Sequence, residues 1–206
     1  MKASHEENVS TELGPRPIIK SIEISGGGWK IDDRRPELLL QAEILDLGEK
    51  TDEGNIVRTV ALPWKQILGE IKRDPDFLYQ FVGYPREFEE FIAGVYDQSG
   101  YEVVLTPRSG DGGRDIIASK HGFGCVRLLE QIKAYKPGHL VTHEDVRAML
   151  GVLSTDNNAS KALITTTSDF QPRILTSPEF AQFIPNRLEL KNGSQVLDWL
   201  DTLDQL

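Results

Sequence analysis

Cysteine is almost absent from this chain, and several other signals that mark particular classes of protein are absent as well. The single cysteine, Cys125, excludes an intrachain disulfide and a cysteine-based zinc cluster, and its apolar surroundings predict that it is buried. No stretch approaches the ~20 apolar residues that a membrane-spanning helix requires, and no apolar run follows Met1 and Lys2. We therefore expect a cytoplasmic protein that makes no contact with a membrane.

Positive charge is also scarce. The chain carries 23 Lys and Arg against 32 Asp and Glu, which gives a formal net charge of -9. Dedicated sequence-specific DNA readers are usually basic on their binding face, so any positive surface here must be local or created by bound metal cations. The chain has no Gly-x-x-x-x-Gly-Lys-Ser/Thr motif, so movement driven by nucleotide hydrolysis would require another protein. Its length suits one domain, or one domain with a small appendage.

The first 80 residues are predicted to form a tail and a small unit. Residues 1–17 are polar and end in Gly-Pro-Arg-Pro, which predicts a flexible tail. Residues 18–80 are predicted to form a small β-rich unit, with strands over 18–25, 38–47 and 56–62 and a polar turn over 49–55. Pro63 is expected to open the helix that ends this unit, because apolar residues follow it at helical spacing. The stretch matches no motif that carries a known role.

The chain changes character at residue 84, where a second domain is predicted to begin and to run to residue 206. Pro85 suits the first turn of a helix, and apolar residues recur at helical spacing from Phe88 to Tyr96. The remaining elements are predicted as strands over 101–106, 114–119, 125–135, 162–166 and 187–190, with helices opening at 142 and 172 and over 196–203. The order α-β-β-β-α-β, then α-β-α, predicts an α/β fold in which helices cover both faces of a mixed sheet.

Polar residues on two neighbouring predicted strands indicate a site. Gln131 and Lys133 are two residues apart, so they share one face of their strand, whereas Glu130 points to the other face. Asp115 lies on the preceding strand of the same hairpin, within reach of cross-strand contact. Glu89 lies beside the apolar stripe of the helix before these strands, so it could reach the sheet. Because Gln131 shares a strand face with Lys133 and Glu130 does not, we choose Gln131 over Glu130 as the residue on the metal side.

This combination of residue types suits the hydrolysis of phosphodiester bonds. That reaction needs an activated water and positive charge near the phosphate, and a bound Mg²⁺ supplies both. Mg²⁺ prefers carboxylate and water oxygens as ligands, and one or two protein acids suffice to hold it. A nearby lysine can orient the attacking water or offset the negative charge that develops in the transition state.

The chain from about residue 84 to residue 206 resembles the Mrr-like restriction endonuclease domain of the PD-(D/E)xK nuclease superfamily. The matching segments occur in the family's order and span more than half of the chain, so together they are more specific than any single motif. They are Phe88-Glu89, Gly100-Tyr101-Glu102-Val103, Asp111-Gly112-Gly113-Arg114-Asp115-Ile116, Gln131-Ile132-Lys133-Ala134-Tyr135, Val146-Arg147, Gly151, Thr165-Thr166-Thr167-Ser168-Asp169-Phe170 and Asn192-Gly193.

The resemblance implies a restriction-endonuclease-like α-β-β-β-α-β core and a Mg²⁺-dependent DNA endonuclease, with Mn²⁺ able to substitute. It implies that Asp115 is a metal ligand, that Gln131 fills the position usually held by Glu, and that Lys133 is the catalytic lysine. It also suggests Glu89 as the helix-borne acid that compensates for Gln131. Two departures, Asn192 where Asp is frequent and Pro172 where Ala is frequent, fall outside the proposed site.

Several of these residues also have an ordinary structural interpretation. Asp111 suits the Gly-rich turn in which it lies, and Glu89 stands near a helix N-terminus, where acids are favoured by the dipole. Strand propensity explains the three threonines at 165–167 as well as a place in the cleft does. A contact with phosphate and a solvated position are equally consistent with the sequence for Arg114, Lys136 and Arg147.

We conclude from the sequence that the chain is a metal-dependent DNA endonuclease, with a role in defence against foreign or modified DNA. The expected mechanism is in-line attack by a metal-activated water, with Asp115, Glu89 and Gln131 on the metal and Lys133 as the catalytic lysine. The alternatives are a Holliday-junction or repair nuclease with the same core and a DNA-binding or adaptor module that does not cut. RNA also stays open as a substrate. A homodimer is expected on symmetry grounds, and residues 18–80 are candidates for binding an activating partner protein.

Overall fold

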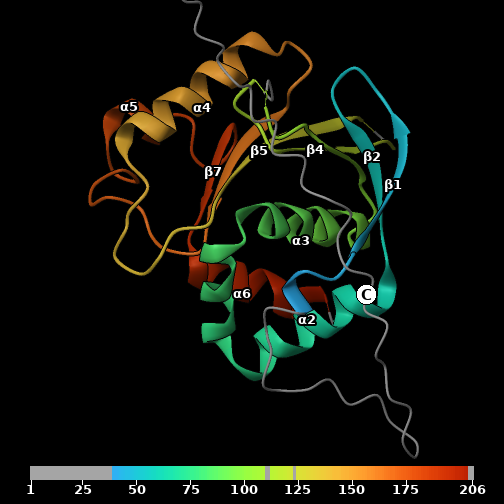
Figure 1. Ribbon diagram of the computed structural model, residues 1–206. Helices are drawn as coiled ribbons and strands as arrows, with labels where there is room; N and C mark the ends of the chain where they lie inside the picture. Colours follow the sequence, from blue (N-terminus) through green and yellow to red (C-terminus); the bar gives the residue numbers. More distant parts are fainter. Residues whose placement is uncertain (1–38, 110–111, 123, 204–206) are drawn as a thin grey trace, which may run out of the picture.

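The computed structural model describes residues 39–109, 112–122 and 124–203. A seven-stranded mixed sheet lies between two layers of helices (Figure 1). The strands are β1 (Leu45–Lys50), β2 (Asn55–Thr59), β3 (Glu102–Leu105), β4 (Ile116–Lys120), β5 (Val126–Lys133), β6 (Lys161–Thr166) and β7 (Leu188–Lys191). The helices are α2 (Ala61–Arg73), the 3-10 segment η1 (Pro75–Gly83), α3 (Pro85–Gln98), α4 (His143–Thr155), α5 (Pro178–Ala181) and α6 (Gly193–Thr202).

The strands lie in the sheet in the order in which they occur along the chain, from β1 at one edge to β7 at the other. Strands β1 to β5 pair antiparallel with their neighbours, whereas β5 and β6, and then β6 and β7, pair parallel. The change of direction falls at β5, because the chain crosses from β5 to β6 through α4 rather than through a hairpin. Strand β5 is therefore an interior strand with an antiparallel neighbour, β4, on one side and a parallel one, β6, on the other.

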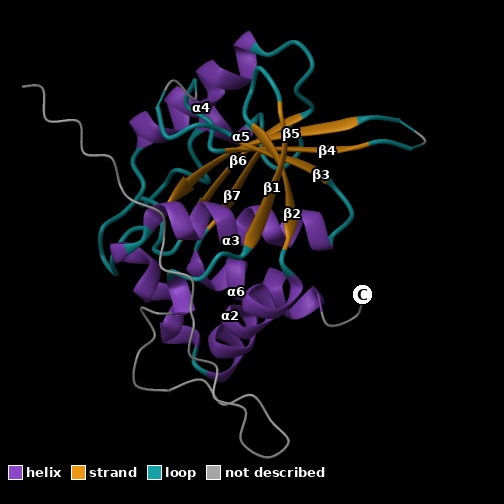
Figure 2. Cartoon of the chain, turned by 45° about the vertical axis from the view of Figure 1, so that its right-hand side comes forward, coloured by secondary structure: helices purple, strands orange, loops and turns teal. Residues whose placement is uncertain are grey.

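Two hydrophobic clusters separate the sheet from the two helix layers. Helices α2, α3 and α6 cover one face, and α4 and α5 cover the other (Figure 2). Alternation along β5 assigns its side chains to these faces, since Leu128 and Ile132 belong to the cluster under α3 and Leu129 belongs to the cluster under α4. By the same alternation, Glu130 faces the α3 layer, and Arg127, Gln131 and Lys133 face the α4 layer.

Helix α3 forms and packs as its sequence predicts. Pro85 occupies the first turn, where its missing N–H costs no hydrogen bond, and the aromatic residues at 88 and 91 are fully buried against the sheet. Trp64 of α2 donates a hydrogen bond from Nε1 to the Phe91 carbonyl oxygen at 3.0 Å. The two helices meet at Gly94, where a Cβ atom would lie 2.3 Å from Trp64 Nε1. This close approach fixes the position of α3 and of the acidic residues at its start.

The predicted α/β fold with an α-β-β-β-α-β core is confirmed, and the predicted helix at Thr142 begins with the expected capping box. The described part of the N-terminal unit does not form a separate sheet, because β2 pairs with β3 and the cluster under α3 includes residues from both stretches. The division into two domains near residue 84 stays a prediction. The predicted tail over 1–17 and strand over 18–25 lie outside the described residues.

Three local predictions were wrong. The strand predicted over 38–47 includes a helical end at Leu39 and Leu40, and β1 begins only at Leu45, because an apolar run with no clear period is compatible with either structure. The helix predicted over 172–183, with an interruption at Pro178, is mostly turns, because α5 is limited to the four residues Pro178–Ala181, and Arg173 has a φ of 70° that a helix does not permit. Cys125 is exposed rather than buried, since it precedes β5 in a turn.

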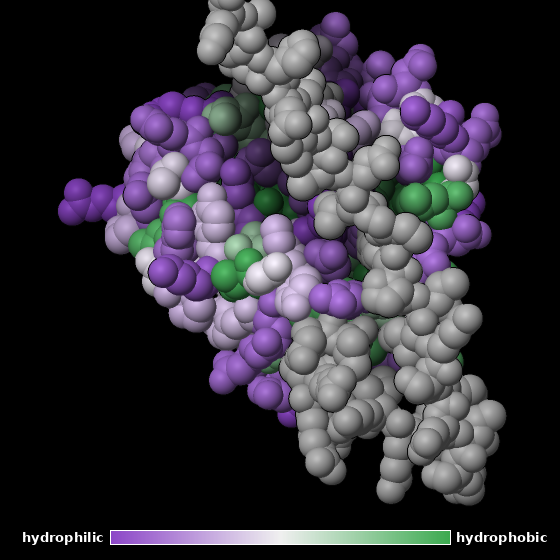
Figure 3. Space-filling model, viewed as in Figure 1, coloured by the Kyte–Doolittle hydropathy of each residue, from purple (hydrophilic) through white to green (hydrophobic). Residues whose placement is uncertain are grey.

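The described surface is mostly hydrophilic on the face drawn in Figure 3, where apolar residues gather in small separate spots. None of the described helices combines the length and the apolar composition of a membrane-spanning segment. The contacts that this face can offer are therefore largely polar and charged.

Candidate active site

Asp115 lies where β4 begins, and hydrogen bonds hold it on both sides. Its backbone N–H donates to the Glu130 carbonyl of β5 at 2.8 Å, and its carbonyl accepts hydrogen bonds from the N–H and hydroxyl of Thr106, each at 3.0 Å. Its carboxylate oxygen Oδ2 accepts the N–H of Ile132 at 2.7 Å. The Asp115 carboxylate is thus hydrogen-bonded to the backbone of β5 between Gln131 and Lys133.

Strand β5 carries Glu130 on one face and the predicted site residues Gln131 and Lys133 on the other. Gln131 and Lys133 are half-buried on the α4 face, whereas Glu130 is buried on the α3 face near Tyr96. Burial raises the pKa of Glu130 to about 7, although Thr165, Tyr96 and the charge of Lys191 oppose this increase. Glu130 is therefore poorly suited to present a charged carboxylate on the face that carries Gln131 and Lys133.

Glu89 of α3 lies close enough to Asp115 for the two carboxylates to repel each other. Burial and then the charge of Asp115 raise the pKa of Glu89 to about 7. Arg86, one helical turn earlier, donates a hydrogen bond from Nη1 to Glu89 Oε2 at 2.6 Å and lowers this pKa, as does the charge of Arg108. The structure thus brings Glu89 close to Asp115 from helix α3, which covers the face of the sheet opposite to the one that carries Gln131 and Lys133.

Lys133 forms an ion pair with Asp145, in which Nζ lies 3.3 Å from Oδ1. The other oxygen of Asp145 accepts the N–H of Thr142 at 2.9 Å and its hydroxyl at 2.7 Å, as part of the capping box that starts α4. Burial alone would raise the pKa of Asp145, but the hydrogen bonds from Thr142 and the charge of Lys133 together lower it. The first turn of α4 therefore holds a charged carboxylate against the lysine.

The threonines at 165–167 are fully buried, and two of them support the end of β5. Thr166 donates its hydroxyl to the Lys133 carbonyl at 2.8 Å, and Thr167 donates its hydroxyl to the Tyr135 carbonyl at 2.6 Å. The backbone N–H of Thr167 also donates to the Lys133 carbonyl at 3.2 Å. The backbone and the side chain of Lys133 are thus both held, which limits the positions that its ammonium group can reach.

The side chains proposed as metal ligands are suited to a hard divalent cation. Glu89 and Asp115 offer carboxylates and Gln131 offers an amide oxygen, and such donors suit Mg²⁺ and Mn²⁺, which keep several water ligands. In the described part of the chain, no group of three or more His, Cys, Asp or Glu side chains is placed to hold a metal. The repulsion between Asp115 and Glu89 is a condition that a bound cation relieves.

Three neighbours of these residues were missed by the sequence reasoning. Arg86 pairs with Glu89, Arg108 affects its pKa, and Asp145 pairs with Lys133. The spacing of three residues between Arg86 and Glu89 on a predicted helix is a usable signal, because such residues are neighbours on a helix surface. No such signal exists for Asp145 and Lys133, which belong to different elements. Asp111, the first residue of the Gly-rich motif, lies outside the described residues.

The Mrr_cat family model, described as "Restriction endonuclease", matches residues 84–200, more than half of the chain. The chain belongs to this restriction endonuclease family. Restriction endonucleases are DNA-cleaving hydrolases, and the match includes all four predicted site residues, from Glu89 to Lys133. Among curated proteins, none matches the chain.

Two solved structures of restriction endonucleases are similar to this chain. One is the MspJI restriction endonuclease in complex with a 27-mer oligonucleotide, with a TM-score of 0.45 and 18% identity, covering 79% of this chain and 38% of that one. The other is the DNA modification-dependent restriction endonuclease AspBHI, with a TM-score of 0.45 and 18% identity, covering 78% of this chain and 43% of that one. The chain thus spans less than half the length of either protein.

Proposed function

We propose that this restriction endonuclease domain hydrolyses phosphodiester bonds of DNA in a reaction that depends on Mg²⁺ or Mn²⁺. The observation that carries the proposal is the position of Asp115, whose carboxylate is hydrogen-bonded to β5 between Gln131 and Lys133 and lies close to Glu89. The family match adds support, because the same residues fall within its limits. A role in defence against foreign or modified DNA is the biological context that we propose for this activity.

In this proposal Asp115, Glu89 and Gln131 hold the cation. When bound, the cation would lower the pKa of a water molecule and would offset the negative charge of the phosphate. The chain keeps the Asp115 carboxylate in place through the Ile132 N–H, and Arg86 limits the movement of Glu89.

Lys133 carries three N–H donors on its ammonium group. Asp145 holds the group in position, and we propose that a remaining donor orients the attacking water or contacts a phosphate oxygen.

The proposal is tested by incubating supercoiled plasmid with the purified protein in Mg²⁺, in Mn²⁺ and in EDTA. We expect metal-dependent nicking or linearisation, and a loss of at least ~100-fold in rate for Asp115→Ala and for Lys133→Ala, because each removes a group that acts on the reacting atoms. Lys65→Ala is the matched control, since it removes one positive charge from an exposed position on α2. Wild-type activity in either site variant would contradict the assignment.

The substrate and the assembly are further parts of the proposal. A four-way junction and a linear duplex of the same sequence, compared in one assay, distinguish a restriction activity from a junction-resolving one, and a matched RNA duplex tests the sugar preference.

Cleavage of both strands requires two active sites or two successive events, so we propose a homodimer during the reaction. Residues 18–80 are proposed to bind an activating partner. Light scattering with and without duplex DNA measures the assembly.

A further inference from the structure

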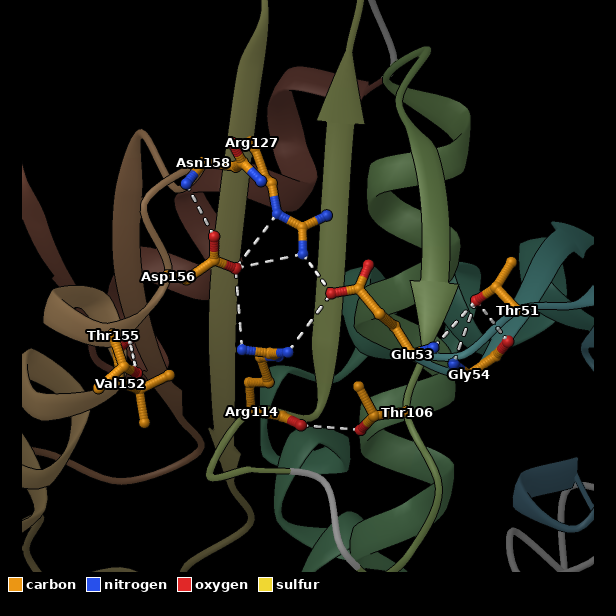
Figure 4. A network of polar contacts seen from close by, with 10 residues as sticks. All are labelled: Thr51, Glu53, Gly54, Thr106, Arg114, Arg127, Val152, Thr155, Asp156 and Asn158. Atoms are coloured by element: carbon orange, nitrogen blue, oxygen red, sulfur yellow. Dashed lines mark hydrogen bonds and ion pairs between the residues drawn. The ribbon is translucent and has the colours of Figure 1, made fainter.

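Four charged side chains alternate in sign around a surface pocket beside β4 and β5 (Figure 4). Arg127 Nη2 lies 2.6 Å from Glu53 Oε1 and 3.2 Å from Asp156 Oδ2. Arg114 contacts the same two oxygens, at 3.4 Å from Glu53 and 3.8 Å from Asp156. We call this set the four-residue ring. It lines a pocket of about 590 Å³ together with the turn that follows α4.

The two carboxylates of the four-residue ring are held unequally. Asp156 caps the end of α4, has a side chain that is 10% exposed, and accepts the N–H of Asn158 at 2.9 Å through its other oxygen. Glu53 belongs to the turn between β1 and β2, and its side chain is 38% exposed. One of its carboxylate oxygens contacts both guanidinium groups. Asp156 is thus a fixed part of the pocket, whereas Glu53 can leave it by a change of side-chain rotamer.

The guanidinium group of Arg114 is not fully satisfied by these two carboxylates. Arg114 Nε is buried, and among the described residues no acceptor forms a hydrogen bond with it. Arginine presents several N–H donors in one plane, a geometry that matches the oxygens of a phosphate as well as those of a carboxylate. If Glu53 turns away, two positive charges face the single negative charge of Asp156, and the pocket gains a net positive charge.

The pocket is also connected to the candidate active site through two elements. Arg114 immediately precedes Asp115 in the chain. Arg127 lies on the same face of β5 as Gln131, four residues away, which is ~13 Å along a strand. A nucleic acid strand that reaches the active site can therefore place a second phosphate near the four-residue ring.

We propose that the four-residue ring is a subsite for a backbone phosphate of the nucleic acid substrate. In the absence of nucleic acid, the Glu53 carboxylate occupies the place of the phosphate between Arg114 and Arg127. Binding exchanges one anion for the other, and Asp156 keeps the guanidinium groups in position during the exchange. This inference rests on the proposed function for the identity of the ligand, but it concerns binding rather than hydrolysis.

The proposal is tested by fluorescence anisotropy of a labelled DNA duplex of about 20 base pairs, titrated with protein in EDTA over a range of salt concentrations. We expect Glu53→Gln to tighten binding by about threefold to tenfold, because it removes the anion that competes with the phosphate. Arg127→Gln should weaken binding at least ~5-fold and reduce the slope of log K against log salt by about 1. The gain from Glu53→Gln should disappear when it is combined with Arg127→Gln.

Glu49→Gln is the matched control, because it removes the same charge from an exposed position on the same hairpin that does not line the pocket. The proposal is overturned if Glu53→Gln binds no more tightly than Glu49→Gln, which includes the case in which neither binds DNA. A lower thermal stability with unchanged binding would show that the ring only holds the hairpin to the sheet. Failure of plasmid cleavage in Mg²⁺ with the expected binding changes would refute the proposed hydrolysis and leave the subsite intact.

Discussion

The two faces of β5 treat their charged residues in opposite ways. On the α4 face, each of the two basic residues has acidic partners, since Lys133 pairs with Asp145 and Arg127 pairs with Glu53 and Asp156. On the α3 face, the carboxylate oxygens of Glu130 are buried and lack a hydrogen-bond partner within the described structure. The hydroxyls of Thr165 and Tyr96 are close enough to lower its pKa but do not meet the geometry of a hydrogen bond.

The comparison shows how one strand can present paired charged side chains on one face and tolerate a carboxyl group in the core on the other. Acidic partners on the α4 face hold Lys133 and Arg127 in place, at the positions where we propose that phosphates bind. The environment of Glu130 favours the neutral acid, because an isolated charge in the core is costly. Position in β5 alone therefore does not make a residue part of the site, and the surroundings of each face decide its role.

The largest expected effect concerns Glu130. Its pKa is raised from 4.5 to about 7, so it contributes stability that is fully present below about pH 4.5 and is lost as the pH rises through 7. We expect the free energy of unfolding, measured by urea denaturation in EDTA, to fall by on the order of 3 kcal/mol over this range because of Glu130. Glu130→Gln should remove most of this fall, and an unchanged pH dependence would refute the interpretation.

Glu189 of β7 provides a control of opposite sign. Burial alone would raise its pKa, but hydrogen bonds and charges from Lys191 and Lys161 lower it. Its contribution to stability is therefore present at neutral pH and is lost as the pH falls. Glu189→Gln should make the decrease in stability between acidic and neutral pH steeper, the reverse of the change expected for Glu130→Gln.

The second-largest expected effect concerns Asp145, which forms the ion pair with Lys133. Asp145→Asn removes the charge that holds the lysine but keeps an oxygen that can accept the Thr142 N–H of the capping box. We expect a 10-fold to 100-fold loss of kcat for DNA cleavage with little change in KM, because a misplaced lysine weakens interactions made in the transition state. Asp145→Glu should restore part of the rate.

Thr142→Ala separates this role from helix capping. It removes a hydroxyl that donates to Asp145 and should cost about 1 kcal/mol of stability, but it leaves the carboxylate beside Lys133. Cleavage should stay within about threefold of wild type, since the ion pair persists. Equal losses of rate in Thr142→Ala and Asp145→Asn would assign Asp145 a purely structural role.

The smallest effect concerns Arg127. Arg127→Lys keeps the positive charge, but a lysine lacks the planar fork that reaches Glu53 and Asp156 together. We expect a loss of ~0.5–1 kcal/mol in the free energy of unfolding, because the four-residue ring is partly solvated and its ion pairs are screened. A loss well above this range in a urea denaturation curve would show that the ring is a major support of the sheet.

The sequence predicted elements that depend on local rules. Pro85 and the apolar spacing behind it predicted α3, and Thr142 predicted the start of α4. The pairing of β2 with β3 was not predicted, because strand pairing depends on residues more than 40 positions apart, such as Ile56 and Val104. The turn at Arg173 also has no local signal, since a positive φ at a non-glycine residue is imposed by its surroundings.

In the candidate site, too, features set by local rules were predicted and features that depend on distant residues were not. Alternation along β5 was sufficient to separate Glu130 from Gln131 and Lys133. The proximity of Glu89 to Asp115 could only be suggested, because it depends on how deeply α3 packs on the sheet. The four-residue ring was beyond prediction, since Glu53 and Arg127 are separated by 74 residues and meet only after the β1–β2 hairpin joins the sheet.

One backbone amide can act as an internal reporter of the proposed ligand. The Ile132 N–H donates to the carboxylate oxygen of Asp115, so its environment depends on the charge that the carboxylate carries. A cation bound to Asp115 withdraws electron density from that oxygen and weakens the hydrogen bond. The NMR chemical shift and the solvent-exchange rate of this single proton therefore register occupancy of the site without substrate and without turnover.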